Sequence, residues 1–184
     1  MKWQGYDAWQ RVAVIGTSGC GKTRMAQNLA AVLGHAHIEL DAIHWLPNWQ
    51  ERPLEPFRQL VTEALAGDAW VVDGNYGKVR DIVWGRATSI VWLNYPRVVV
   101  LGRILWRTWQ RCIRREELFS GNRETFATAM FGRESIIAWS MGTFAKHRRE
   151  YPQLFEQPEY AHLQVVELRQ PRQAQALLTE LARK

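Results

Sequence analysis

A glycine-rich segment directly after a short apolar run most constrains how this chain folds. Residues 16–23 are Gly-Thr-Ser-Gly-Cys-Gly-Lys-Thr, and the apolar run Val12 to Ile15 precedes them. They match the pattern G-x-x-x-x-G-K-[ST], between a predicted strand and a predicted helix, which is typical of a phosphate-binding loop. Glycines are needed because the backbone must curl until successive N–H groups point at phosphate oxygens. A chance glycine-rich turn is the weaker alternative, because every fixed position of the pattern is filled.

Each part of this loop has an expected role toward a bound nucleotide. Lys22 is expected to reach the β- and γ-phosphates, and the Thr23 hydroxyl to bind Mg²⁺. The helix that begins here presents its positive end to the anion. We therefore expect ATP and Mg²⁺ as cofactors, although the sequence leaves ATP and GTP undistinguished. The residues expected to bind the nucleotide are Gly16, Thr17, Ser18, Gly19, Cys20, Gly21, Lys22 and Thr23.

Length and composition favour a single globular domain over residues 1–184. The 184 residues suffice for one core, with 47% hydrophobic and 23% charged residues. No apolar stretch reaches the length of a membrane span. The chain leads almost directly into its first predicted strand, so we expect no signal peptide and a cytoplasmic protein. The net charge of +6 suits a polyanion, either a nucleotide or a nucleic acid.

Strand and helix patterns alternate along the chain. Strands are predicted at residues 11–15, 37–40, 69–72, 88–93 and 163–168, and helices at 22–33, 54–66, 79–85, 97–115, 133–150 and 172–182. Residues 42–53 contain two prolines and are predicted to be a loop. Five strands joined by helical crossovers predict an α/β, three-layer sandwich with a five-stranded parallel sheet. Ligands of such a sheet bind where the strands end.

Two carboxylates follow predicted strands at this edge. Asp73 is expected to hold Mg²⁺, directly or through water, although an aspartate that only caps a turn is the alternative. Asp41 is expected to accept or orient the proton of an acceptor hydroxyl, provided that the two strands are neighbours. His44 is a weaker candidate, because a lone histidine is more often structural.

Arginines recur at helical spacing after the fourth predicted strand. They are Arg103, Arg107, Arg111, Arg114 and Arg115, with Arg123 and Arg133 further along the chain. We interpret them as a clamp on the transferred phosphate, the alternative being a solvated basic face. The polar residues 116–132 between the two long helices are expected to close over the phosphates as a lid.

Together these motifs resemble the adenylate-kinase-like small P-loop kinases, from Arg11 to about Leu181. The features that carry the resemblance are Gly16 to Thr23, Ile38-Glu39-Leu40-Asp41-Ala42-Ile43-His44-Trp45, Val71-Val72-Asp73-Gly74-Asn75-Tyr76, Arg114-Arg115-Glu116-Glu117 and Gly121-Asn122-Arg123-Glu124. They look most similar to the subgroup of DNA topology modulation proteins. The resemblance implies a nucleoside monophosphate kinase-like fold with a helical lid.

The resemblance also implies roles for particular residues. Arg103 would pack on the base, Arg107 would touch phosphate, and Arg123 and Arg133 would correspond to arginines of the flap. Gln170, in Arg169-Gln170-Pro171, would lie in the loop whose backbone holds the base. The chain departs from adenylate kinases at Asn94, where they have aspartate, and at residues 75–78, where they have Phe-Pro-Arg. Asp41 instead resembles the acceptor-side carboxylate of shikimate and dephospho-coenzyme A kinases.

We therefore expect an ATP-dependent kinase that transfers the γ-phosphate to an unidentified small-molecule or nucleotide acceptor. Its expected catalytic residues are Lys22, Asp41, Asp73, Arg107, Arg123 and Arg133, and its expected metal ligands are Thr23 and Asp73. The alternative is a nucleotide-dependent protein associated with nucleic acid, with weak ATPase activity. In that case the arginines would grip a phosphate backbone, and binding would fall steeply with salt.

Overall fold

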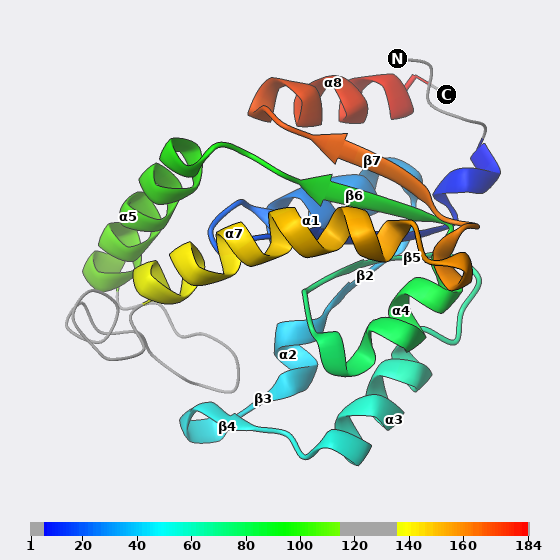
Figure 1. The fold of residues 1–184 in the computed structure, drawn as a ribbon, viewed down its shortest axis with the longest axis horizontal. Coiled ribbons are helices and arrows are strands. Elements are labelled where there is room, and N and C mark those ends of the chain that lie inside the picture. Colours follow the sequence, from blue (N-terminus) through cyan, green and yellow to red (C-terminus); the bar gives the residue numbers. More distant parts are fainter. Residues whose placement is uncertain (1–5, 115–135, 184) are drawn as a thin grey trace.

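A parallel five-stranded sheet forms the centre of the computed structural model (Figure 1). The structure describes residues 6–114 and 136–183, with residues 6–7, 107–114 and 136–141 as backbone only. The strands are β1 (Arg11–Gly16), β2 (Ala36–Glu39), β5 (Trp70–Asp73), β6 (Ser89–Leu93) and β7 (Gln164–Leu168). Their order is β2-β5-β1-β6-β7, and every pair is parallel. The predicted α/β fold with a five-stranded parallel sheet is confirmed.

Helices cover both faces of the sheet (Figure 1). They are α1 (Lys22–Leu33), α2 (Leu40–His44), α3 (Leu54–Ala64), α4 (Arg80–Arg86), α5 (Arg97–Arg114), α7 (Ile136–Phe155) and α8 (Pro171–Leu181). Single 3₁₀ turns lie at Tyr6–Trp9, Pro47–Trp49, Gly77–Val79 and Pro158–Tyr160. Among the described residues, no helix is long and apolar enough to cross a membrane.

The two faces of β1 enter two separate hydrophobic cores. Val12 and Val14 pack with buried residues of α1 and α8, whereas Ala13 and Ile15 pack with residues of α3, α4 and α7. Successive side chains of a strand point to opposite faces, so a strand buried on both faces needs an unbroken apolar sequence. This is why the run before the glycine-rich loop contains no polar residue.

The register of the strands brings the sequence motifs to one edge. Asp73 at the end of β5 is paired with Val14 of β1 and with Glu39 of β2. On the other side of β1, Gly16 is paired with Leu93 of β6. The glycine-rich loop therefore starts between the ends of β5 and β6.

The prediction of a loop over residues 42–53 was wrong. The second strand in the chain, predicted to end at residue 40, ends at Glu39 in the structure. The chain then forms α2 and a small hairpin of β3 (Trp45–Leu46) and β4 (Gln50–Glu51). The buried ring of His44 holds this segment against the rest of the protein. Its centroid lies 4.9 Å from that of the Phe57 ring and 4.4 Å from that of the Tyr76 ring. These partners are distant in sequence, so the local pattern did not reveal them.

The helix predicted at residues 133–150 is described from Ile136 and continues beyond its predicted end to Phe155, although Pro152 lies inside it. Tyr151 and Phe155 pack against Trp84 and Trp92, which accounts for the extension. The predicted lid at residues 116–132 lies outside the described residues.

Candidate functional site

The glycine-rich loop connects β1 to α1, as its sequence predicted. The N–H of Cys20 donates to the carbonyl of Thr17 at 3.1 Å, which closes a turn within the loop. Gly19 has a φ of +80°, and a Cβ atom there would lie 2.2 Å from Cγ1 of Ile104 in α5. Only glycine fits this position, because both the backbone conformation and the space exclude a side chain. Burial raises the pKa of the Cys20 thiol, so this cysteine stays protonated inside the loop.

Two carboxylates and an imidazole surround the Thr23 hydroxyl beside the loop. The hydroxyl oxygen of Thr23 lies 2.8 Å from Oδ2 of Asp73 and 3.2 Å from Oε1 of Glu39. Oδ1 of Asp73 is 2.8 Å from Nε2 of His37 on β2. Sequence analysis named Thr23 and Asp73 but missed Glu39 and His37. The pairing of β2 with β5 places these two residues beside Asp73, and a single sequence does not show which strands pair.

The electrostatics of this cluster favour a cation. Burial and the nearby charge of Asp73 raise the pKa of Glu39, which shows that the two carboxylates repel each other. A hydroxyl and two carboxylates are oxygen ligands of the kind that Mg²⁺ prefers. Within the described residues, no three His, Cys, Asp or Glu side chains form a metal site by themselves. A Mg²⁺ ion here would therefore need phosphate oxygens and water as further ligands.

The segment after β5 attaches the glycine-rich loop to the rest of the site. The Asn75 side chain makes hydrogen bonds with both backbone groups of Gly16: it accepts from the N–H at 3.2 Å and donates to the carbonyl. Gly74 lies against Leu40, where a Cβ atom would meet the Leu40 Cβ at 2.8 Å. The asparagine thus fixes the start of the loop, and the glycine lets α2 approach β5 closely.

Asp41 lies within α2 rather than at the end of β2, where sequence analysis placed it. The condition set for its role is met, because β2 and β5 are neighbours. Its Oδ1 accepts a hydrogen bond of 2.5 Å from the Tyr76 hydroxyl. Burial and the charge of Asp41 raise the pKa of Tyr76, so the phenol remains a neutral donor. The tyrosine therefore fixes the orientation of the carboxylate.

His44 lies in a cluster of aromatic side chains. Its side chain is 3% exposed, and its ring packs among Trp45, Phe57 and Tyr76. Burial lowers its pKa, which favours the neutral ring. These contacts favour the structural alternative for this residue.

Arg103 lies against the glycine-rich loop. Its guanidinium donates to the carbonyl of Cys20 and stacks over Tyr95, with Cζ 5.0 Å from the ring centroid. Arg107, Arg111 and Arg114 belong to α5 but are described as backbone only, and Arg115, Arg123 and Arg133 lie outside the described residues. Gln170 is exposed, and its side chain caps α8 by accepting from the backbone N–H of Gln173.

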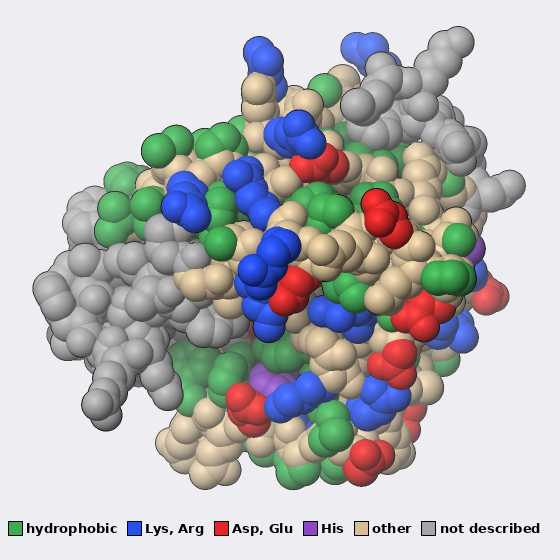
Figure 2. Space-filling model, viewed as in Figure 1, with side chains coloured by type: hydrophobic (Ala, Val, Ile, Leu, Met, Phe, Trp, Pro, Cys, Tyr) green, Lys and Arg blue, Asp and Glu red, His purple; other side chains and the backbone are tan. Residues whose placement is uncertain are grey.

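Helix α7 supplies residues that sequence analysis did not consider. Arg148 donates to Oδ1 and the carbonyl of Asn94 at the end of β6, at 2.5 Å and 3.2 Å. His147 stacks on Tyr151, with ring centroids 4.7 Å apart and planes inclined by 9°. Burial and the charge of Lys22 lower the pKa of His147 to about 4. Figure 2 shows basic side chains over α7, mixed with acidic ones.

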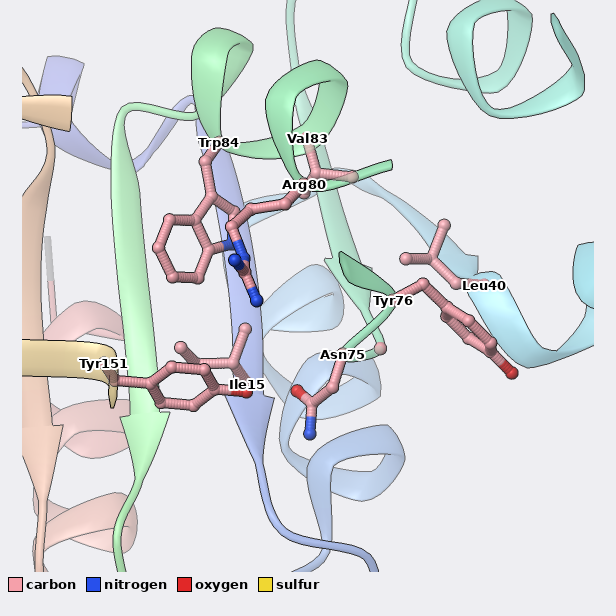
Figure 3. A pocket seen from close by; sticks show the side chains of 9 residues that line it. Ile15, Leu40, Asn75, Tyr76, Arg80, Val83, Trp84 and Tyr151 are labelled. Atoms are coloured by element: carbon pink, nitrogen blue, oxygen red, sulfur yellow. The ribbon is translucent and has the colours of Figure 1, made fainter. Parts of the chain in front are cut away.

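A pocket opens beside the glycine-rich loop (Figure 3). Its lining residues are Ile15, Leu40, Gly74, Asn75, Tyr76, Arg80, Val83, Trp84 and Tyr151. Ile15 lies near the end of β1 and Gly74 directly follows β5, so the pocket adjoins both the loop and the carboxylate cluster. Its walls are mostly aromatic and aliphatic, and Arg80 is the only charged residue among the described residues that line it.

Comparisons with known proteins agree on the fold. A gluconokinase from Sinorhizobium meliloti 1021 matches with a TM-score of 0.52 and 21% identity, over 95% of this chain and 94% of that chain. A shikimate kinase from Acinetobacter baumannii, solved with shikimate, matches with a TM-score of 0.56 and 17% identity, over 96% and 92%. A shikimate kinase from Bacteroides thetaiotaomicron gives 0.55 and 15%, over 95% and 97%. The chain therefore has the fold of small P-loop kinases.

Sequence comparison adds a further similar protein. A protein of Bacillus subtilis (strain 168), named YqaC and described as uncharacterized, is 25% identical over 104 residues. The match covers 55% of this chain and 58% of that relative's length. No protein-family model matches the chain. Membership of the DNA topology modulation subgroup stays a prediction.

Proposed function

We propose that this protein is an ATP-dependent kinase that transfers the γ-phosphate to a hydroxyl group of a small acceptor. The observation that carries the proposal is the convergence of Thr23, Asp73 and Glu39 beside a glycine-rich loop at the start of α1. Further support comes from proteins of the same fold, which are named as gluconokinase and shikimate kinases. They are small-molecule kinases, and the acceptor of this chain is still to be identified.

The proposed roles are supported by the contacts around the loop and by the motif itself. The loop N–H groups and the N-terminus of α1 would bind the phosphates, and Lys22 would neutralise charge on the β- and γ-phosphates. Thr23, Asp73 and Glu39 would hold Mg²⁺, which would neutralise charge on the phosphate oxygens. Arg103 keeps the loop against α5. Arg107, Arg123 and Arg133 remain proposed contacts to the phosphates, and Gln170 remains a proposed contact near the base.

Asp41 is the proposed group on the acceptor side. During transfer, the acceptor oxygen forms a bond to the γ-phosphorus while the bond from that phosphorus to the ADP oxygen breaks. The hydroxyl proton passes to Asp41 and ADP leaves with the electron pair of the broken bond. Tyr76 holds Asp41 in one orientation through its 2.5 Å hydrogen bond.

The substitution Lys22→Ala tests the proposal. We expect it to abolish ADP release stimulated by any acceptor, in a screen of nucleoside monophosphates, nucleosides and small alcohols. Lys78→Ala is the matched control, because Lys78 is exposed and pairs only with Glu51 among the described ion pairs. Unchanged turnover in Lys22→Ala would rule the mechanism out.

The nucleic-acid alternative gains no support from the described residues or from the proteins of similar fold. It predicts binding of DNA that weakens steeply with salt, in the absence of acceptor-stimulated ADP release. The same screen, with a DNA-binding titration at two salt concentrations, separates the two functions.

A further inference from the structure

Arg80 presents a positive charge to the pocket beside the glycine-rich loop. Its side chain is half-buried, and its Cζ lies 5.2 Å from the centroid of the Trp84 ring. Figure 3 shows the guanidinium between Trp84 and Asn75, directed into the hollow toward Ile15. None of the ion pairs among the described residues includes Arg80. The pocket therefore contains a cation that no described carboxylate neutralises.

Two neighbouring polar groups are already engaged. The amide of Asn75 is bonded to the backbone of Gly16, and the hydroxyl of Tyr76 donates to Asp41. Among the described residues of the lining, Arg80 is the charged side chain, and no described residue forms an ion pair with it. A half-buried guanidinium lacks part of its hydration, and a carboxylate or phosphate compensates for this through two parallel hydrogen bonds.

The walls of the pocket set the shape of the rest of the ligand. Trp84 and Tyr151 lie on one side, and Leu40 and Tyr76 on the other (Figure 3). The hollow is open to solvent, and its empty space of about 270 Å³ includes part of that solvent, so a bound small molecule would remain partly exposed. Aromatic and aliphatic walls favour a flat or apolar body over a strongly hydrated one.

The position of the pocket relates it to phosphate transfer. Its residues Ile15 and Gly74 directly adjoin the glycine-rich loop and Asp73. The carboxylates Asp73, Glu39 and Asp41 all lie at this edge of the sheet and repel a second anion. Because the nucleotide occupies Lys22 and the loop N–H groups in the proposed reaction, Arg80 is the cation of the pocket lining that remains for the anionic group of a second ligand.

We propose that the acceptor is a small hydroxyl compound with a flat or apolar body and one anionic group, a carboxylate or a phosphate monoester, which Arg80 binds. The inference rests on the proposed kinase function and specifies the acceptor class of the same site. The anionic group anchors the acceptor, and the hydroxyl at its other end faces the γ-phosphate.

Calorimetric binding of matched probes tests this inference without requiring turnover. The carboxylate arm compares 4-(hydroxymethyl)benzoate with the neutral 4-(hydroxymethyl)benzamide. The phosphate arm compares AMP with adenosine. All titrations contain saturating Mg·ADP, so that AMP does not occupy the glycine-rich loop. The variants are Arg80→Gln, Arg80→Lys and, as the matched control, Arg172→Gln on the exposed start of α8.

We expect the anionic probe of at least one arm to bind more tightly than its neutral partner. Arg80→Gln should weaken that binding roughly ten- to hundredfold, the range for a hydrogen bond to a charged group, and leave the neutral partner unchanged. Arg80→Lys should restore part of the affinity, because it keeps the charge but loses the planar fork. Arg172→Gln should bind as the wild type does. The arm that responds identifies carboxylate or phosphate.

Other results overturn the inference. They are equal affinity for charged and neutral probes, unchanged affinity in Arg80→Gln, or no binding of any probe to wild-type protein that still binds Mg·ADP. In each of these cases the kinase proposal survives, because nucleotide binding is measured separately. Failure of the wild type to bind Mg·ADP overturns the kinase proposal, and this inference with it.

Discussion

Glu39 and Asp41 are close neighbours in the chain, yet they serve different parts of the site. Glu39 ends β2, where its register partner is Asp73, so its carboxylate meets the Thr23 hydroxyl. Asp41 lies in the first turn of α2 and is held by Tyr76. The change from strand to helix between them turns the two side chains toward different partners. This difference in partners supports the proposal that one carboxylate holds the metal and the other serves the acceptor.

Replacing Glu39 with glutamine should affect the free and the nucleotide-bound protein in opposite directions. The raised pKa of Glu39 means that its ionised form is disfavoured in the folded protein. We expect Glu39→Gln to raise the unfolding temperature of the free protein by about 1–3 °C, since repulsion between partly exposed charges is weak. The variant should gain less thermal stability from Mg·ADP than the wild type does. Thermal unfolding with and without Mg·ADP measures both effects.

The sign of the pH dependence provides a check on this interpretation. A carboxyl with a raised pKa contributes stability that is present below its ordinary pKa of 4.5 and is lost as pH rises through its folded value. The unfolding temperature of the wild type should therefore drop further below that of Glu39→Gln as the pH increases from 4.5 to 7. A temperature difference that stays constant over this range would contradict the prediction.

Replacing His147 with phenylalanine should reduce the amount by which the free energy of unfolding falls as the pH decreases. Burial, together with Lys22, Lys146 and Arg80, lowers the pKa of His147 from 6.5 to about 4. Between these values the unfolded chain binds a proton that the folded protein does not, so stability falls as pH decreases. The slope from this one group is at most about 1.4 kcal/mol per pH unit, and partial exposure makes it smaller.

Denaturant unfolding of the wild type and His147→Phe at several pH values between 6.5 and 4 measures this contribution. Phenylalanine keeps a ring to stack on Tyr151 but does not titrate. The difference between the two curves isolates His147 from the carboxylates that also titrate here. Parallel curves would show that His147 takes up no proton on unfolding, and would contradict a lowered pKa in the folded protein.

Helix α5 packs against the glycine-rich loop and supports it. Ile104 occupies the space that a side chain at Gly19 would need, and Arg103 binds the carbonyl of Cys20. Asn75 holds the loop from the opposite side, through Gly16. The loop is therefore held between the segment after β5 and the first part of α5, which fixes its N–H groups in the free protein.

Two glycine-to-alanine substitutions near this contact should have opposite effects. Gly19→Ala forces a left-handed residue to carry a Cβ atom that overlaps Ile104, so we expect a loss of about 1–3 kcal/mol and at least tenfold weaker Mg·ADP binding. Gly102→Ala, within α5, has open space around its Cβ position and should stabilise the protein by about 0.5–1 kcal/mol. Denaturant unfolding and nucleotide titration measure both variants. Similar effects of the two substitutions would contradict the proposed packing of the loop.

The same contacts explain which elements a single sequence predicts. The central strands β1, β5 and β6 contain unbroken apolar runs and α1 begins at a recognisable motif, so local patterns sufficed for the centre of the sheet and for the position of Lys22 and Thr23. The prediction for residues 42–53 failed because His44 packs against Phe57 and Tyr76, which come later in the chain. Glu39 and Arg80 were missed for a related reason. Their environment depends on the order of the strands and on the packing of Trp84 of α4 against Tyr151 of α7, which no local pattern contains.

For the whole molecule, the sheet separates two cores but places the glycine-rich loop at one edge common to both. The core on the side of α1 and α8 includes Leu177, and the core on the side of α3 and α4 includes Leu65; both side chains are fully buried. Strand β1 contributes to both cores and ends in the glycine-rich loop. Disruption of either core should therefore unfold the site together with the rest of the domain.

This coupling predicts equal behaviour for cavities on opposite sides of the sheet. Leu177→Ala and Leu65→Ala should each lower the free energy of unfolding by about 2–5 kcal/mol, through lost burial and an unfilled cavity. Mg·ADP at a hundred times its Kd should then add about 2.7 kcal/mol to the wild type and to each variant alike, because it binds only the folded state. Denaturant unfolding followed by circular dichroism, with and without Mg·ADP, measures all six values. A smaller increment in one variant would mean that its core unfolds separately from the nucleotide site, and that the sheet does not couple the two faces into one cooperative unit.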